Sequence, residues 1–116
     1  MNSYSVIGRN GRDLKTDGLL HPGEVLASEI EARGILKSDL AAALGIKPGN
    51  LTELLKGKRH VSALLALKME TLLGIDASLW LRLQGEFDLG VAKRSFTKSQ
   101  HVKLRQRSKT LRRKVY

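Results

Sequence analysis

The sequence predicts an all-α fold: a five-helix bundle followed by a basic C-terminal extension. Three observations support this prediction. No segment alternates apolar and polar residues with the period of two that is typical of strands. Apolar residues recur instead at helical spacing, in segments that begin at a capping residue or proline and end at glycine. With 116 residues, 41% of them hydrophobic, the chain has enough apolar surface for one small domain.

The first two predicted helices both end at a glycine. Pro22 opens the first helix, because a missing N–H costs least at the first helical position, and Gly34 lies beyond its end. His21 stands just before this helix. Ser38 can cap the second helix, and Gly45 can end it in the left-handed conformation.

Three further helices are expected at short intervals. Pro48 opens the third, which should be about two turns long. Ser62 caps the fourth, ALLALKMETLL, which closes at Gly74. Asp76 or Ser78 caps the fifth, SLWLRLQGEFDL, and the short connections between all five are typical of a helical bundle.

The segment from Leu40 to Ser62 has the pattern of a helix-turn-helix. Gly45, Ile46 and Lys47 join two short helices; the glycine permits a sharp reversal, and Ile46 fills the core beneath it. In this motif the second helix enters the major groove of DNA with its N-terminus first. Taken alone, the stretch also fits an ordinary αα-hairpin with a solvated basic loop.

The exposed side chains of the second motif helix are candidate base readers, because its leucines are spaced to face the core. Asn50 is the best of them, since its amide can form two hydrogen bonds with the edge of adenine. The other candidates on this helix are Lys47, Gly49, Thr52 and Glu53. The loop that follows is suited to binding phosphates through Lys56, Lys58 and Arg59.

The pattern LAAALGI…LTELLKGKR…LALKMETLLGIDASLWLRLQGEFDL resembles the HigA or VapI family of antitoxins and regulators, a branch of the Xre-like helix-turn-helix repressors with a lambda-repressor-like fold. The similarity runs from HPGEVL through Leu89 and covers more than half of the chain. Its specific parts are HPGE at the start, Leu40-Ala41 and Leu44-Gly45, Gly57-Lys58-Arg59, Trp80-Leu81, Leu83-Gln84 and Asp88-Leu89. A general helix-turn-helix repressor would not require the last three pairs.

The resemblance implies a homodimeric antitoxin that binds an inverted repeat in the promoter of its own operon and represses it. It also implies a partner, a small ribonuclease toxin similar to the HigB or RelE class. An orphan regulator of phage or plasmid type, with no toxin, is the alternative within DNA binding. An alternative of another class is a nucleic-acid-binding or RNA-binding adaptor that works through its basic tail.

Two departures from the family's pattern affect DNA recognition. Family members commonly carry polar residues, often Ser then Arg or Gln, where this chain has Lys47, Pro48 and Gly49. Lys37, beside Ser38, stands where a glutamine often reaches the phosphate backbone, and a lysine can still bind phosphate as a point charge. We therefore expect phosphate binding to remain and base discrimination to depend on Asn50 and on DNA shape.

The last helix of the predicted bundle carries a set of apolar residues on one face: Leu79, Trp80, Leu83 and Phe87. Core packing is the favoured interpretation for Trp80. The alternative is a dimer seam, which would set DNA half-sites about one helical turn, roughly 34 Å, apart. Both can hold along different edges of one helix.

Charge divides the chain. Residues 1–91 hold 11 basic and 11 acidic residues and sum to zero, whereas residues 92–116 hold the other 10 basic residues and no acidic one. We therefore predict an N-terminal arm (1–20), a DNA-binding domain (21–90) and a basic tail (91–116). Such a tail usually binds a polyanion, most often nucleic acid, although a solvated disordered run or a contact with an acidic protein is also possible.

Several classes of protein are poorly supported. The chain has no cysteine, no apolar run of membrane-spanning length and no signal peptide, so we expect a soluble cytoplasmic protein, associated with the bacterial nucleoid at its operator. His21, His60 and His101 are isolated, so no metal or other cofactor is expected. No catalytic motif is present, and an enzyme is the least supported class.

Overall fold

The predicted all-helical fold is present in the computed structural model, which describes residues 18–115, with side chains described through Leu111. This part of the chain contains six helices and no strand: α2 (Pro22–Arg33), α3 (Lys37–Leu44), α4 (Pro48–Leu55), α5 (Ala63–Leu73), α6 (Ala77–Ser95) and α7 (Lys98–Val115). The expected number of five helices is therefore wrong, because the basic tail forms a helix of its own. Most of the predicted N-terminal arm, residues 1–17, lies outside the described residues.

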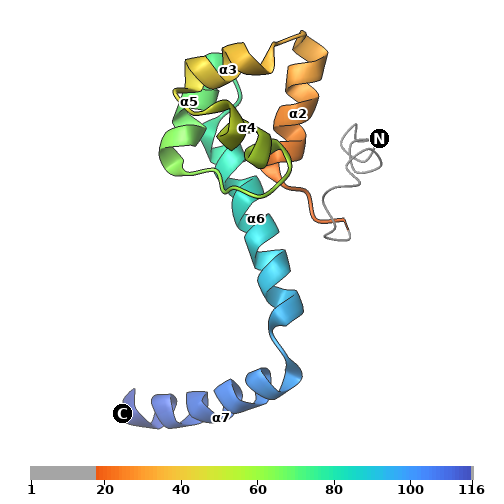
Figure 1. Cartoon of the computed structure of the whole chain (residues 1–116). Helices are drawn as coiled ribbons and strands as arrows, with labels where there is room; N and C mark the ends of the chain where they lie inside the picture. The colour runs from red at the N-terminus through yellow and green to blue at the C-terminus, as the bar shows by residue number, and fades with distance from the viewer. Residues whose placement is uncertain (1–17, 116) are drawn as a thin grey trace.

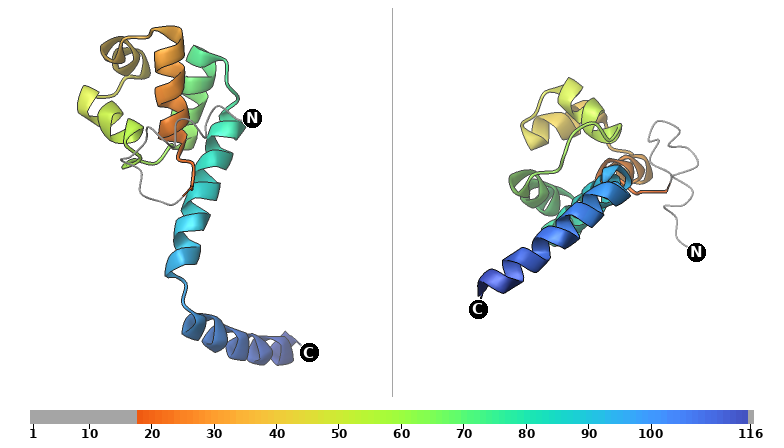
Figure 2. Two further views of the ribbon diagram at one scale, coloured as in Figure 1. Left: turned by 90° about the vertical axis from the view of Figure 1, so that its right-hand side faces the viewer. Right: turned by 90° about the horizontal axis from the view of Figure 1, so that it is seen from below.

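Helices α2 to α5 and the first half of α6 enclose one core, and the rest of α6 projects away from it (Figures 1 and 2). Trp80 and Gln84 are the buried residues of α6, and both lie in its first half. The largest fully buried apolar side chains, which share this one core, are Trp80, Leu26, Leu44, Leu51, Leu54, Met69 and Val25. The core thus holds both motif helices against α2 and α5.

Most of the predicted helix ends are confirmed. Gly34, Gly45 and Gly74 follow their helices with φ of 66°, 73° and 75°, in the left-handed region that glycine adopts without strain. Ser62 caps α5 by accepting a hydrogen bond from the N–H of Leu65 at 3.1 Å.

The N-cap predictions for the second and fifth helices are only partly right. Ser38 does not cap α3, because α3 begins at Lys37 and its N-cap is Leu36. Asp76 is at the N-cap of α6, but its side chain makes no capping hydrogen bond. Helix α3 therefore starts without a side-chain cap, although the preference of serine for N-cap positions predicted one at Ser38.

Cationic side chains satisfy the C-terminal carbonyls of two helices. The Arg33 guanidinium donates a 2.8 Å hydrogen bond to the carbonyl of Leu73 at the end of α5. The Lys68 ammonium donates a 3.0 Å hydrogen bond to the carbonyl of Leu44 at the end of α3. Positive charge at these ends also complements the helix dipole, so both contacts tie neighbouring helices together.

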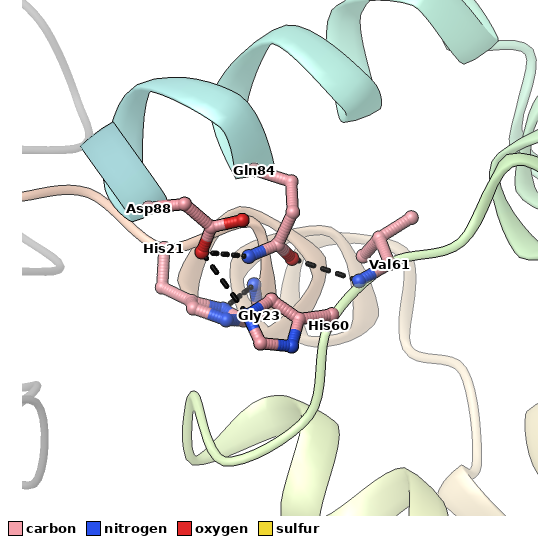
Figure 3. A network of polar contacts seen from close by, with 6 residues as sticks. All are labelled: His21, Gly23, His60, Val61, Gln84 and Asp88. Carbon is pink, nitrogen blue, oxygen red and sulfur yellow. Dashed lines mark hydrogen bonds and ion pairs between the residues drawn. The ribbon is translucent and has the colours of Figure 1, made fainter. Parts of the chain in front are cut away.

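His21 is the N-cap of α2 and is almost fully buried, at 1% exposure. Its Nδ1 accepts a hydrogen bond from the N–H of Gly23 at 2.8 Å (Figure 3). The Glu24 carboxylate accepts one from the N–H of His21 at 3.2 Å. The imidazole also meets the Phe87 ring edge-on, with ring centroids 4.7 Å apart. This reciprocal capping box requires neutral imidazole at Nδ1, and burial lowers the pKa of His21 to about 4.

Helix α6 is longer than predicted, because it continues through Gly85 and Gly90 to Ser95. A glycine inside a helix costs only about 1 kcal/mol relative to alanine, so neither glycine ends it. Leu19 lies so close to Gly90 that any Cβ there would overlap it. In the described part of the chain, no helix is long and apolar enough to span a membrane.

The pair Gly23 and Gly49 gives a test of how α2 packs on α4. Both glycines follow a proline at the start of a helix, but a Cβ at Gly23 would overlap the carbonyl oxygen of Leu54, whereas a Cβ at Gly49 would meet open space. Gly23→Ala should therefore lower the free energy of unfolding by about 1–3 kcal/mol. Gly49→Ala should leave it unchanged or raise it by up to about 1 kcal/mol, and urea unfolding measures both. Equal changes in the free energy of unfolding of the two variants would contradict the close approach of α2 and α4.

The buried His21 should make stability fall in mild acid. Its pKa is 6.5 when unfolded and about 4 when folded, so between these values the unfolded chain binds more protons. The contribution of neutral His21 to the free energy of unfolding is complete above pH 6.5. It is lost as the pH falls toward 4, by up to about 1.4 kcal/mol per pH unit. Glu24 opposes the effect near the acid end, because burial raises the pKa of its carboxyl group.

The variant His21→Asn is the matched control, since asparagine can still cap the helix but does not titrate. We expect the thermal unfolding temperature of the original chain to fall between pH 7 and pH 5. The His21→Asn variant should unfold at a lower temperature at pH 7, but its unfolding temperature should change less over this range. Parallel pH profiles for the two proteins would show that another group is responsible.

Candidate nucleic-acid interface

The turn between α3 and α4 is held by backbone hydrogen bonds. The N–H of Gly45 donates to the carbonyl of Ala42 at 3.1 Å, and that of Ile46 donates to the carbonyl of Ala41 at 3.0 Å. Ile46 is half-buried and packs against the core, as expected of the residue beneath the turn. Pro48 then opens α4, so the local geometry is that of a helix-turn-helix.

Helix α4 buries Leu51 and Leu54 and leaves its other face outside. On this outer face Asn50 is half-buried, and the remaining predicted base-reading positions are exposed: Lys47, Gly49, Thr52 and Glu53. The Thr52 hydroxyl donates a 3.1 Å hydrogen bond to the carbonyl of Pro48, one turn earlier. Helix α4 thus presents a polar face of the kind that a recognition helix needs.

Asn50 is hydrogen-bonded to Arg59, a residue that was predicted to bind phosphate. The Arg59 guanidinium donates to Oδ1 of Asn50 at 2.9 Å and to the carboxylate of Glu53 at 2.8 Å. The bond to Asn50 orients its amide with the oxygen toward Arg59 and the NH₂ group left available, and the bond to Glu53 holds Arg59 in place. The sequence did not indicate that these three residues act as one group.

Side chains from α6 hold the loop after α4 in place (Figure 3). The buried Gln84 accepts a hydrogen bond from the N–H of Val61 at 2.7 Å and donates one to the Asp88 carboxylate at 3.0 Å. Asp88 in turn contacts Nε2 of His60 at 3.1 Å. The loop is therefore anchored to α6 through the backbone of Val61 and the side chain of His60, immediately after its basic residues.

Gln84 and Asp88 were part of the quoted family pattern, but no role was predicted for them, and His60 was considered only as a metal ligand. A signal was present, because the i, i+4 spacing of Gln84 and Asp88 places them on one face of a helix. Their partners are 23 and 28 residues away in the sequence, so only the folded chain reveals them.

The other predicted DNA-binding residues lie on exposed surface. Lys37 and Ser38 are in the first turn of α3, Lys56 is the C-cap of α4, and Lys58 follows in the loop. No group of three or more His, Asp or Glu side chains is placed to hold a metal ion in the part of the chain that the structure describes.

The apolar residues of α6 divide between core and surface. Trp80 is fully buried, and its indole N–H has no hydrogen-bond acceptor among the described residues. Leu83 packs against the core from its edge, and Leu79 and Phe87 are half-buried. Trp80 therefore belongs to the core, while the other three keep exposed edges.

Comparisons with known proteins agree with this geometry. The Helix-turn-helix family matches residues 26–80, which run from α2 into α6. The chain is 35% identical over 74 residues to virulence-associated protein I of Dichelobacter nodosus, covering 63% of this chain and 68% of that protein.

Two solved structures have a similar fold. An addiction module antidote protein of the HigA family from Coxiella burnetii matches with a TM-score of 0.64 and 32% identity, over 70% of this chain and 89% of that one. The Pseudomonas aeruginosa antitoxin HigA, solved with the higBA promoter, matches with a TM-score of 0.65 and 28% identity, over 70% and 89% of the two chains. These similarities show that the chain belongs to the HigA/VapI branch of the Xre-like helix-turn-helix family.

Proposed function

We propose that this protein is a HigA-like antitoxin that binds operator DNA, represses its own operon and neutralises a small ribonuclease toxin. The observation that carries the DNA-binding part is the exposed polar face of α4, where Arg59 orients the amide of Asn50. The antitoxin part rests on the similarity to antidote and antitoxin proteins of the HigA family.

In this proposal α4 enters the major groove with its N-terminus first, and Asn50 reads an adenine. The amide NH₂ donates to adenine N7, and Oδ1 accepts from the adenine amino group. Because a carbonyl oxygen has two lone pairs, Oδ1 can keep its hydrogen bond from Arg59 while it binds the base. Arg59 thus limits the freedom of the amide before DNA arrives, which lowers the entropic cost of reading the base.

Phosphate contacts would fix the position of α4 in the groove. Lys56 and Lys58 after the recognition helix, and Lys37 with Ser38 at the start of α3, are exposed and suited to this task. Gly49 has no side chain on the exposed first turn of α4, so the backbone there can approach DNA closely.

We further propose that residues 21–90 form the DNA-binding domain and that two copies bind an inverted repeat. Leu64 and Leu67 on α5 are 63% and 54% exposed, which supports a contact with a second protein surface. In a symmetric dimer the half-sites would be about one helical turn, roughly 34 Å, apart. The toxin would be encoded in the same operon.

Base reading and phosphate binding can be separated by two substitutions. Asn50→Ala should reduce the preference for the upstream region of the chain's own operon over a scrambled duplex by about 10-fold to 100-fold, because one bidentate contact is worth about 1–3 kcal/mol. Lys58→Ala should weaken binding to both duplexes alike. Fluorescence anisotropy with both duplexes measures the two effects, and an unchanged preference in Asn50→Ala would remove its role as base reader.

The toxin is tested by expressing the tagged chain with its adjacent reading frames from their native operon. We expect a small partner to co-purify in stoichiometric amount, to be identified by intact mass, and to inhibit growth when expressed alone. Native mass of the purified complex counts the copies of each chain. Recovery of the tagged chain by itself, from an operon with harmless neighbours, would exclude the antitoxin function and leave a DNA-binding regulator.

A further inference from the structure

We propose that α7 is a second DNA-binding element, which binds the phosphates of duplex DNA without regard to sequence. Its place beside the operator rests on the proposed function, but its binding to duplex DNA does not. The proposal starts from charge: residues 98–115 contain eight basic residues and no acidic one. The five basic side chains that the structure describes are exposed and make no ion pair: Lys98, Lys103, Arg105, Arg107 and Lys109.

The fold itself contributes little to the stability of α7. The helix lies away from the bundle and does not pack along another described helix (Figures 1 and 2). Lys103 with Arg107, and Arg105 with Lys109, are like charges four residues apart, which destabilise an isolated helix. Lys98 in the first turn also opposes the helix dipole. A polyanion would remove these unfavourable terms, so α7 should be more stable on nucleic acid than alone.

The start of α7 is nevertheless well defined. Thr97 and Gln100 form a reciprocal cap, in which the N–H of Thr97 donates to the Gln100 amide at 2.7 Å and the N–H of Gln100 donates to the Thr97 hydroxyl at 3.2 Å. The rings of Phe96 and His101 lie beside this cap with centroids 4.0 Å apart. The helix therefore begins at a defined point, and only two residues separate it from the end of α6.

The distribution of charge around α7 favours a groove over a flat surface. At 100° per residue, Leu104 and Leu111 fall on one narrow stripe. The five described basic side chains lie on both sides of it: Lys103 and Arg107 on one flank, and Lys98, Arg105 and Lys109 on the other. The major groove of B-DNA is about 12 Å wide, admits one helix and carries phosphates on both walls. Positive charge on both flanks of the helix matches that arrangement.

Other partners fit less well. A second copy of α7 would bring together two helices that each carry eight basic residues, with only a thin apolar stripe between them. A membrane surface requires a broad apolar face, which two leucines do not provide. Duplex RNA is disfavoured because its deep, narrow major groove does not admit a helix.

Helices α4 and α7 belong to one continuous chain and lie toward opposite ends of the molecule (Figure 1). When α4 is bound at the operator, the covalent link keeps α7 at a high effective concentration near the flanking DNA. Helix α7 would then add affinity and salt dependence without adding base discrimination.

The test replaces four charges in the full chain: Lys103→Gln, Arg105→Gln, Arg107→Gln and Lys109→Gln. Glutamine keeps helix propensity, and these side chains contact nothing in the core, so thermal unfolding of the bundle should not change. The matched control alters four uncharged residues of the same helix: Ser99→Ala, Gln106→Ala, Ser108→Ala and Thr110→Ala. The probe is a random-sequence DNA duplex of about three helical turns, titrated by anisotropy at several salt concentrations.

We expect the slope of log affinity against log salt to become shallower by up to about 3.6 in the glutamine variant, since each lost phosphate contact removes about 0.9. The double variant Lys103→Gln/Arg107→Gln should give about half of this change, and the control none. An unchanged slope in the quadruple variant would overturn the proposal. So would a loss of binding to polyglutamate with no change on DNA, because this would assign α7 to an acidic protein surface.

The same variants separate this inference from the proposed function. The quadruple glutamine variant should keep the preference for operator over scrambled duplex, because α7 reads no bases. If the unaltered chain shows no such preference but the slope still changes in the variant, the operator function fails and the assignment of α7 stands. Duplex RNA bound as tightly as duplex DNA by the unaltered chain would overturn the assignment to a DNA groove.

Discussion

The buried hydrogen bond between the N–H of Val61 and the amide of Gln84 is the contact on which the proposed DNA-binding face of the molecule depends. Val61 lies in the loop between α4 and α5, so its N–H cannot form a hydrogen bond within a helix. Leaving this buried donor unpaired would cost about 1–3 kcal/mol. The Gln84 side chain accepts this hydrogen bond and donates a second one to the Asp88 carboxylate, which also contacts the imidazole of His60 (Figure 3). The position of the loop is thereby fixed relative to α6.

The loop also contacts the outer face of α4. Arg59 lies directly before His60, and it is the residue that binds both Asn50 and Glu53 on the outer face of α4. These outer contacts are exposed, and each contributes little to the free energy of unfolding. In the proposed function, their effect is to restrict the side chains that would contact DNA, and Gln84 supports this restriction by anchoring the loop at Val61.

Charge and packing are distributed differently along the chain. Residues 1–91 sum to zero charge and include every buried residue that the structure describes, whereas the basic excess lies entirely in residues 92–116. A neutral domain with a few placed cations suits discrimination between sequences, and a densely basic helix suits attraction to any DNA. The chain thus keeps its folding determinants separate from its strongest electrostatic element.

What the sequence determined by itself was local. Pro22 and Pro48 start helices, Ser62 caps α5, and Gly45 and Gly74 end helices, because each of these effects acts within four residues along the chain. The helical periodicity likewise identified the all-α class and the helix-turn-helix. The extension of α6 beyond Gly90 and the helix in the tail were not predicted, because marginal propensity does not decide whether such a segment is ordered.

Only the tertiary structure decided the contacts between distant residues. His60 meets Asp88 across 28 positions, and Arg33 meets the carbonyl of Leu73 across 40. Asn50 and Arg59 are nine apart, but the turn between them must fold before the two side chains can meet. The sequence shows which polar side chains will need a hydrogen-bond partner if they are buried. It does not identify that partner, because the partner depends on which helices the hydrophobic core brings together.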